Sequence, residues 1–284
     1  MLSGGASFGS WRLLWHGPAR GSWNMAVDEA LLEEVGAHRS PPTLRLYAWS
    51  PPALSLGAHQ DAAAVVNHSA LDAAGVDLVR RPTGGRAVLH DAEVTYSVTL
   101  PLDDPSLPAG VLGSYRYLSG ALAAGLRRLG LRAGLKAWEG SATGRSPACF
   151  AAPSWYELVV GRRKLVGSAQ LRRQRALLQH GSILLRLDVG RLLSLLRWPD
   201  ETARQRENAR LLEQAGALEP LLGRSLCWEE VATAVAAGFG EQLGVTLARG
   251  EFTVEEQKQA EWLDRHKYST AAWTWERAVP GDQE

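Results

Sequence analysis

A cysteine in a loop is the residue of this sequence best suited to covalent chemistry. Cys149 lies in the stretch SPACFAAPSWYE, between Pro147 and Pro153, where neither helical nor strand periodicity is present. Loop residues held on a rigid scaffold often carry function, although a free cysteine is commonly a small buried hydrophobic residue. The position of Cys149 therefore fits both a nucleophile and a core residue.

A nucleophilic thiol needs a partner, because a free thiol with a pKa of about 8.5 is mostly protonated at neutral pH. Lys164 follows a Gly-containing turn and could lower the thiol pKa or stabilise an oxyanion. His180 could act as a base. Each has a plainer alternative: Lys164 as a solvated hairpin lysine, and His180 or His90 as a loop histidine bonded to backbone. Cys227 falls on the apolar stripe of an expected helix, and we interpret it as structural.

Two glycine-containing stretches could form the walls of a binding site. The first is RRPTGGR, Arg80 to Arg86, in which paired glycines allow close approach of the backbone and the arginines favour an anionic group. It matches neither the P-loop nor the dinucleotide-binding pattern, and a simple strand–turn–strand would look the same. The second is VGSAQ, Val166 to Gln170, whose small side chains could form the floor of a narrow pocket or mark a bulge.

Length and composition limit the class of protein. The chain has 284 residues, of which 45% are hydrophobic and 21% charged, which fits one large globular unit with at most a small appendage. Lys and Arg number 31 against 30 Asp and Glu, and this balance argues against a general nucleic-acid binder. Two cysteines cannot build a disulfide framework or a thiolate zinc site, so we expect no metal. With no signal peptide and no apolar run of about 18 residues, we expect a cytoplasmic protein.

Hydrophobic periodicity indicates the elements that would position these residues. The pattern predicts strands over 43–49, 53–57, 76–80, 94–100, 157–160, 164–166 and 183–187, and helices over 23–35, 112–129, 189–196, 201–212, 228–243 and 254–265. In the first helix, Asp28 and Glu29 lie off the apolar stripe. The chain is thus mixed to about residue 188 and helical beyond it. No helix has a spare apolar face, so we expect a monomer. Basic clusters that could meet an acidic partner occur at 127–128, 162–164 and 172–175.

Several of these stretches together resemble one family. The resemblance rests on NMAVDEALL (24–32), RRPTGGRAVLHDAEVTYSV (80–98), ACFAAPSWYELVV (148–160), KLVGSAQ (164–170), LQHGSILL (178–185) and KYSTAAW (267–273). In this order they are similar to the lipoate/biotin protein ligase superfamily, and within it to the cysteine-dependent octanoyltransferases. The similarity covers most of the chain.

This resemblance implies an α+β fold: a mixed, largely antiparallel sheet flanked by helices, like the catalytic core of class II aminoacyl-tRNA synthetases and biotin protein ligases. Residues 1–221 would form the catalytic domain, and 222–284 a helical extension on the same unit. The implied activity moves an octanoyl group from acyl carrier protein to one lysine of a lipoyl-accepting protein. The expected acceptor is the glycine cleavage H protein, with lipoyl domains of 2-oxoacid dehydrogenases as the alternative.

The resemblance also assigns roles to residues. It implies that Cys149 is the nucleophile and that Lys164 is the catalytic lysine. The implied substrate-binding residues are Arg81, Thr83, Gly84, Gly85, His90, Gly167, Ser168, Ala169 and His180. No cofactor is implied, because exchange between thioesters is nearly isoenergetic and transfer from thioester to amide is downhill.

Two departures separate the chain from the ATP-dependent lipoate ligases of the superfamily. Those ligases have a third glycine where this chain has Arg86, and Ser146–Cys149 replaces their metal-and-nucleotide motif. Three alternatives stay open: such a ligase, an amidotransferase that moves octanoyl or lipoyl groups between proteins, and a non-catalytic acyl-binding module.

Overall fold

A computed structural model describes residues 9–137, 148 and 156–278. Its centre is an eight-stranded sheet with the strand order β11-β1-β2-β6-β10-β9-β8-β7. The strands are β1 (Ser10–Ala19), β2 (Thr43–Trp49), β6 (Glu93–Pro101), β7 (Gly134–Ala137), β8 (Tyr156–Val160), β9 (Arg163–Arg173), β10 (Ala176–Leu184) and β11 (Thr246–Arg249). β1 is parallel to both of its neighbours, and every other pairing is antiparallel. The predicted α+β class with a mixed, largely antiparallel sheet is therefore confirmed.

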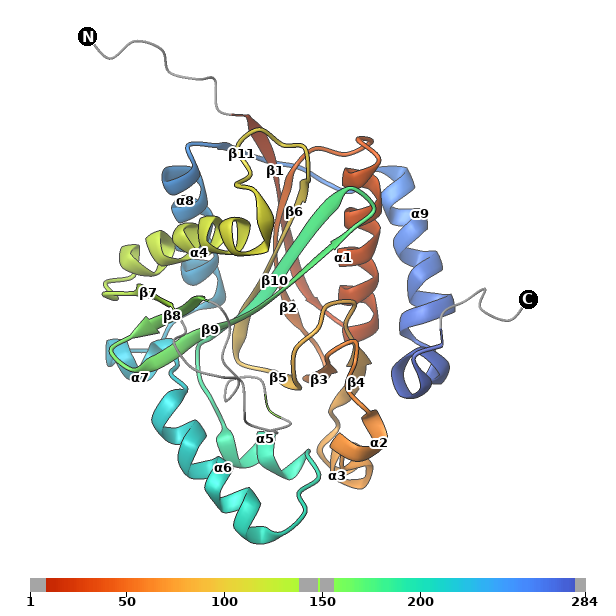
Figure 1. Ribbon diagram of the computed structural model, residues 1–284, viewed down its shortest axis with the longest axis vertical. Coiled ribbons are helices and arrows are strands. Elements are labelled where there is room, and N and C mark those ends of the chain that lie inside the picture. Colours follow the sequence, from red (N-terminus) through yellow and green to blue (C-terminus); the bar gives the residue numbers. More distant parts are fainter. Residues whose placement is uncertain (1–8, 138–147, 149–155, 279–284) are drawn as a thin grey trace.

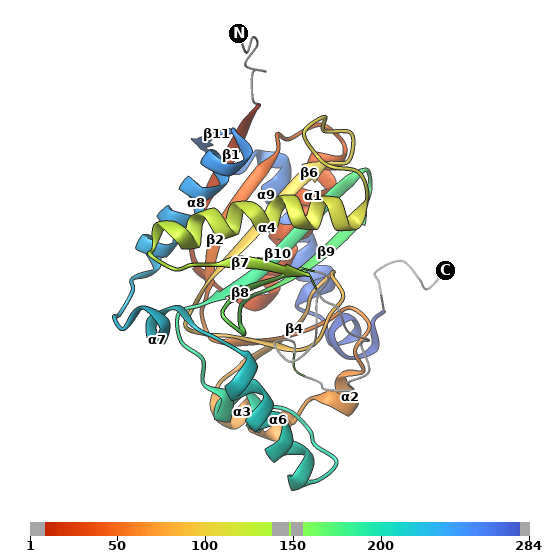
Figure 2. The same cartoon turned by 60° about the vertical axis from the view of Figure 1, so that its left-hand side comes forward.

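Helices cover both faces of this sheet (Figure 1). On one face lie α4 (Gly110–Arg128) and α8 (Trp228–Leu243), and on the other lie α1 (Gly21–Gly36) and α9 (Val254–Leu263). Figure 2 shows α4 running across the front of the sheet. Helices α4 and α8 approach each other closely, since a Cβ on Gly238 of α8 would lie 2.2 Å from the backbone nitrogen of Gly125 of α4. Only glycine fits this crossing.

A small second sheet lies beside the N-terminal end of α1, where Gly21 faces Ala53 and Val79. It has the order β4-β3-β5, built from β3 (Ala53–Leu56), β4 (Asp77–Arg80) and β5 (Val88–His90). Four helices pack around it and the neighbouring loops: α2 (Ala62–Val65), α3 (His68–Ala74), α5 (Val189–Ser194) and α6 (Glu201–Gln214). α7 (Leu218–Leu222) lies beside β8 and β9 instead, with Leu218 in the core of the large sheet (Figure 1). After α9 the chain forms two π-helical turns, Asp264–Tyr268 and Ala272–Glu276, and the second contacts β4.

Side chains of β6 point alternately into two buried layers. Val94, Tyr96 and Val98 belong to the apolar core with α4 and α8. The alternate residues are polar, yet Thr95 and Ser97 are also buried, on the side of α1. Alternation usually separates a core face from a solvated face. Here it separates an apolar core from a buried polar layer, and that layer holds the site described below.

Most predicted elements are confirmed, with some differences. The strand expected over 183–187 is wrong in position, because β10 covers Ala176–Leu184. The mixed order does not end near residue 188, since β11 follows α8. The sequence patterns missed several elements, most of them short: strands β1, β5, β7 and β11 and helices α2, α3 and α7. Cys227 is not on a buried stripe: it is the exposed N-cap residue of α8. In the described part of the chain, no helix is long and apolar enough to cross a membrane.

Candidate active site

A pocket opens between the polar face of the large sheet, α1 and the small sheet. About 350 Å³ that atoms do not fill lies between its walls, a volume that includes open solvent at the mouth, so the pocket itself is narrow. Its lining residues are Met25, Tyr47, Trp49, Ser55, Arg81, Val88, His90, Thr95, Gly167, Ser168, Ala169, His180, Gly181 and Ser182. Six of the residues implied by the resemblance, from three separate stretches of sequence, thus meet at one cavity.

The glycine-containing loop 80–86 forms one rim and is held by its own arginines. The guanidinium of Arg81 donates to the carbonyl oxygens of Ser55 (3.1 Å), Gly84 (2.9 Å) and Arg86 (2.8 Å). Gly85 has a φ of +100°. The loop is therefore a fixed structure rather than an open cradle.

Arg80 plays a similar part behind the rim. Its guanidinium donates to the carbonyl oxygens of Gly57, Gln60, Trp273 and Thr274. The expectation that the loop arginines favour an anionic group is thus not met by Arg80 and Arg81. Both donate to main-chain carbonyls, and Arg81 also donates to the hydroxyl of Ser55.

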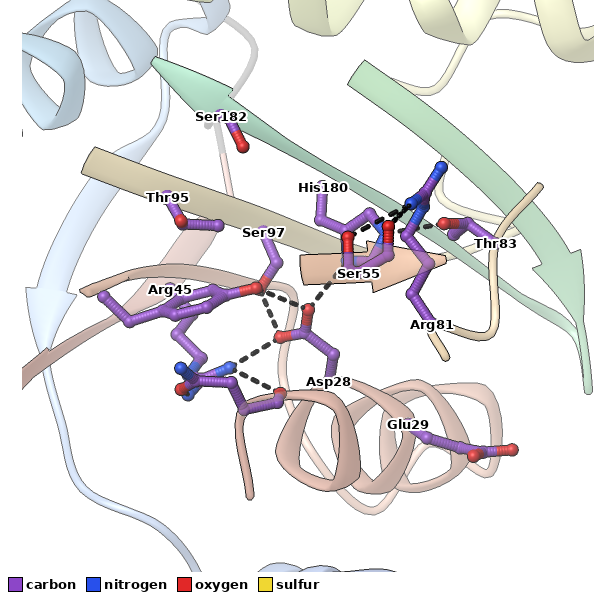
Figure 3. Close-up of polar contacts among 12 residues, drawn as sticks. Asp28, Glu29, Arg45, Ser55, Arg81, Thr83, Thr95, Ser97, His180 and Ser182 are labelled. Atoms are coloured by element: carbon purple, nitrogen blue, oxygen red, sulfur yellow. Dashed lines mark hydrogen bonds and ion pairs between the residues drawn. The ribbon is translucent and has the colours of Figure 1, made fainter. Parts of the chain in front are cut away.

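Asp28 of α1 organises the polar layer beneath the pocket (Figure 3). Its carboxylate accepts hydrogen bonds from Arg45 (2.7 Å), Ser97 (2.8 Å), Tyr47 (3.0 Å) and His180 (2.9 Å). Burial alone would raise the pKa of Asp28, but the bond from His180 and the charge of Arg45 hold it below its usual value. Asp28 is therefore an anion at neutral pH.

The sequence interpretation missed Asp28 and Glu29, which it placed off the apolar stripe of the helix. Both are buried, and Figure 3 shows Glu29 pointing away from the Asp28 cluster. A signal was present: residues 24–32, NMAVDEALL, have apolar residues on every side of the helix. Such a pattern is typical of a helix buried all round, and acidic residues in it need internal partners.

His180 connects Asp28 to the rim of the pocket. Its Nδ1 lies 2.9 Å from Oδ2 of Asp28, and its Nε2 lies 2.6 Å from Oγ1 of Thr83. Burial lowers the pKa of His180, so the ring is neutral at neutral pH. Because ionised Asp28 only accepts, Nδ1 carries the proton, and Nε2 accepts from the hydroxyl of Thr83.

A second acid–histidine–hydroxyl chain lies on the opposite wall. His90 Nδ1 is 2.8 Å from Oε1 of Glu93, and His90 Nε2 is 2.7 Å from Oγ of Ser55. The ring of Trp49 stacks on His90 with the centroids 3.9 Å apart. Neither predicted histidine is a loop histidine bonded to backbone: both lie on strands and bond to side chains.

Of the two residues expected to do the chemistry, the structure describes Lys164 but not Cys149. Cys149 lies outside the described residues, but Ala148 before it is described and pairs with Ala87, at the end of the 80–86 loop. Lys164 is buried on β9, three residues before Gly167 of the pocket, so it is not a solvated hairpin lysine. Lys164 is not among the residues that line the described pocket.

Of the small-residue stretch that could form a pocket floor or mark a bulge, Gly167, Ser168 and Ala169 line the pocket. Gly167 pairs with Ser182, and Ala169 pairs with His180, across the β9–β10 ladder. Of the basic clusters, Arg172 and Arg173 bond to Ser114 and Glu29, and Arg128 bonds to Glu241. Arg127, Arg162 and Arg163 are exposed. Among the described residues, no group of three or more His, Cys, Asp or Glu side chains could hold a metal ion.

Comparison with known proteins agrees with this architecture. The model of the lipoyl protein ligase A/B catalytic domain matches residues 20–240. Octanoyltransferase LipM of Kyrpidia tusciae is 46% identical over 273 residues, which is 94% of this chain and 99% of that protein. Octanoyltransferase LipM of Bacillus subtilis is 40% identical over 274 residues, with coverage of 94% and 99%.

Solved structures show the same fold. A bipartite lipoate protein ligase of Thermoplasma acidophilum superimposes with a TM-score of 0.79 and 26% identity, covering 97% of this chain and 99% of its own. A lipoate-protein ligase A bound with ATP gives a TM-score of 0.75 and 27% identity, with coverage of 94% and 98%.

Proposed function

The chain belongs to the lipoyl protein ligase A/B catalytic-domain family, within which it is an octanoyltransferase related to LipM, and we propose that it works through an acyl-enzyme on Cys149. The donor is octanoyl-acyl carrier protein, and the acceptor is a lysine of the glycine cleavage H protein or of a lipoyl domain. Octanoyl transfer to such a lysine is the first step in making lipoate on the protein itself.

The observation that carries the proposal is that the polar side chains of the pocket walls are already hydrogen-bonded within the protein. Nine of the lining side chains are polar, but each has hydrogen-bond partners within the protein; they are Tyr47, Trp49, Ser55, Arg81, His90, Thr95, Ser168, His180 and Ser182. An occupant thus meets walls whose polar atoms are already bonded. Such a cavity favours an apolar chain, because a polar ligand would lose its bonds to water without replacement.

Chemistry at the mouth of this pocket would proceed in two half-reactions. In the first, the thiolate of Cys149 attacks the octanoyl thioester and forms an S–C bond, while the carrier sulfur leaves as a thiolate and takes up a proton from water. In the second, the neutral amine of the acceptor lysine attacks the acyl-enzyme, the C–S bond breaks with its electron pair on the Cys149 sulfur, and the surplus proton of the amine passes to water. Lys164 stabilises the oxyanion in both steps through its positive charge. The bridge between Ala148 and Ala87 supports the placement of this chemistry beside the 80–86 loop.

The remaining site residues have supporting roles in this proposal. Thr83, Gly84 and Gly85 shape the rim, and Gly85 contacts the backbone of Gly57 so closely that a Cβ on Gly57 would lie 2.0 Å from its oxygen. Gly167, Ser168 and Ala169 line the acyl channel, which His90 and His180 flank. No nucleotide or metal takes part.

Mass spectrometry of the purified protein tests the proposal. We expect octanoyl-acyl carrier protein, without ATP, to add one octanoyl group to the Cys149 peptide, and an apo lipoyl acceptor to remove it. Cys149→Ser should give no transfer, whereas Cys227→Ala, at an exposed helix cap, should behave as wild type. Transfer seen only with free octanoate or lipoate and ATP would instead indicate a ligase, and acyl binding without transfer would indicate a binding module.

A further inference from the structure

The segment that follows α9 joins two walls of the pocket. Met25 lines the pocket from α1, whereas Ser55 and Arg81 line it from the side of the small sheet. Of the two π-helical turns after α9, the first contacts α1 and the second contacts β4, and Figure 1 shows this part of the chain beside these elements. We call residues 264–276 the strap. The mechanism above gives the strap no task.

One end of the strap is fixed to α1. The ammonium of Lys267 lies 2.9 Å and 2.6 Å from the two carboxylate oxygens of Glu29, and the hydroxyl of Tyr268 donates to the same carboxylate. All three side chains are buried, and a buried charge is costly away from its partners. Lys267 also lies 4.3 Å from the ring centroid of Trp273, so the two turns of the strap are in contact with each other.

The other end of the strap is fixed to β4 through Arg80. Nε of Arg80 lies 3.1 Å from the carbonyl oxygen of Trp273, and Nη2 lies 2.7 Å from that of Thr274. In return, Nε1 of Trp273 donates to the carbonyl oxygen of Arg80 at 2.9 Å. Nη1 of Arg80 donates to the carbonyl oxygens of Gly57 and Gln60, in the loop after β3. One buried guanidinium fork thus ties the strap to the ends of both strands.

This attachment lies directly beside the pocket wall. Leu56 and Arg80 are register partners at the ends of the parallel strands β3 and β4. Ser55, which precedes Leu56, and Arg81, which follows Arg80, both line the pocket. A movement of the Arg80 guanidinium would therefore reach the wall within one residue on each strand.

The strap adds a second point of contact between α1 and the small sheet. Near the start of α1 the two meet directly, because a Cβ on Gly21 would lie only 3.2 Å from the side chain of Val79. Glu29, which binds the strap, is eight residues further along the helix, or about 12 Å at 1.5 Å per residue. A contact near one end of a helix leaves its angle to the sheet adjustable, and a second contact two turns away fixes that angle.

We infer that the strap sets the spacing of the pocket walls, and that Arg80 and Trp273 are positioning residues for the selection of acyl chains by length. This inference rests on the proposed function. The pocket is narrow, and in a close-fitting apolar site one methylene more or less changes kcat/KM by about tenfold or more. Walls that can move apart admit a longer chain. Loosening the strap should therefore reduce the discrimination between donors more than the rate with the donor that fits best.

Competition between two donors tests this role. With octanoyl- and decanoyl-pantetheine in one mixture, the ratio of the two acyl adducts reports the ratio of the kcat/KM values, whatever fraction of the protein is folded. Trp273→Phe keeps an aromatic ring and removes the N–H donor, and should lower the preference for octanoyl at least about threefold. Arg80→Lys keeps the charge but cannot bridge both chain segments, and should lower it at least about tenfold.

Hydrogen exchange tests the wall itself without any substrate. The backbone N–H of Arg81 donates to the carbonyl oxygen of Leu56 at 3.0 Å, and that of Ala58 donates to Thr83 at 2.9 Å. In both variants, peptides covering 54–60 and 78–86 should exchange at least about threefold faster than in wild type. Peptides from 94–100, on β6, should exchange at the wild-type rate, because the strap does not contact that strand.

Two controls separate this role from general stability. Trp275→Phe alters the same turn two residues later, where the ring stacks on His68 with the centroids 5.3 Å apart and does not bond to β4. Glu256→Gln removes a buried charge that faces Arg12, near the start of α9, and should destabilise the protein away from the strap. Both variants should keep the wild-type preference for octanoyl and the wild-type exchange.

The possible failures are distinguishable. A wild-type preference in folded Trp273→Phe and Arg80→Lys, or an equal loss of preference in Glu256→Gln, would overturn the role of the strap while the acyl-enzyme remained. The absence of any adduct on wild-type protein with either donor would overturn the proposed function, and the role of the strap in selection with it.

Discussion

The ammonium of Lys267 lies 2.6 Å from Oε2 of Glu29, and both side chains are almost fully buried, at 4% and 2% exposure. This pair joins the π-helical turn after α9 to the middle of α1, the helix that also carries Asp28. Glu29 accepts further bonds from Tyr268 and Arg173. The end of the described chain is thereby fixed to the helix that forms the back of the site.

Removing Lys267 should destabilise the fold, because the buried carboxylate of Glu29 then keeps only the partly exposed guanidinium of Arg173 as a counterion. We expect Lys267→Met to lower the free energy of unfolding by about 1.5–3 kcal/mol. Urea unfolding at pH 7 measures the change. Lys136→Met, at an exposed position on β7, is the control and should stay within about 0.5 kcal/mol. A loss below about 1 kcal/mol at Lys267 would contradict the structural importance of the pair.

Acid should weaken the protein through its buried carboxylates. Burial would raise the pKa of Asp28, Glu29 and Glu256, but their cationic and hydrogen-bonding partners hold each below its ordinary value of 3.8, 4.5 and 4.5. A pKa that is lower in the folded state contributes stability above the unfolded value and loses it as pH falls through the folded value.

Burial also lowers the pKa of His180 and of His16, the latter to about 4, so below about pH 6.5 the unfolded chain binds protons that the folded protein does not. The free energy of unfolding should therefore begin to fall below about pH 6.5 and fall more steeply below pH 4.5, where the carboxylates of the unfolded chain are protonated. Urea titrations at pH 7, 5, 4 and 3 would show this. Glu256→Gln should be less stable at pH 7 and show a smaller loss on acidification, since its bond to Arg12 is then uncharged. A wild-type protein equally stable at pH 7 and pH 3 would contradict the assignment.

The sequence predicted individual helices and strands better than the contacts between them. Strand Thr43–Trp49 appears with the predicted bounds, because alternation and flanking prolines are local signals. The same signals do not say that both faces of β6 are buried, since that depends on α1, α4 and α8 covering the sheet. β7 and β11 have only four residues each, too few to show a period.

The same limit applies to the site: local motifs indicate some of its residues, whereas others are recognised only by contacts that are distant in sequence. Motifs located Arg81, His90, Gly167 and His180, all of which line the pocket. Asp28 could not be found in this way, because its role depends on contact with His180, 152 positions later in the sequence. Likewise, the arginines of the 80–86 loop looked free for an anion until the backbone carbonyls around them were known.

The acyl channel should lose capacity when a glycine in its wall is enlarged. Gly167 lines the pocket on β9, and a valine there would occupy space that an eight-carbon chain needs. We expect Gly167→Val to form a butanoyl but no octanoyl adduct, scored by mass spectrometry with donors of both lengths. Gly134→Val on the edge strand, where a Cβ would meet nothing within 4 Å, should retain the octanoyl adduct. Equal octanoylation of the two variants would place the acyl chain elsewhere.

The exposed turn between β8 and β9 should contribute to binding of the proposed donor, an acidic carrier protein. Arg162 and Arg163 are exposed there and directly precede buried Lys164. From Arg163 to Gly167 the strand spans about 13 Å, at roughly 3.3 Å per residue, so a carrier bound at the turn could extend its acyl arm along β9. An exposed cation that guides an acidic partner acts mainly on association and is screened by salt.

We therefore expect Arg162→Glu to raise the KM for octanoyl-acyl carrier protein roughly fivefold to tenfold at low salt. The same variant should leave the KM for octanoyl-pantetheine, which lacks the acidic protein, at the wild-type value. Arg249→Glu on β11, at the opposite edge of the large sheet, reverses an exposed charge and should change neither constant. If Arg162→Glu altered both donors alike, the effect would lie in the active site rather than in docking, and the carrier would have to bind another face.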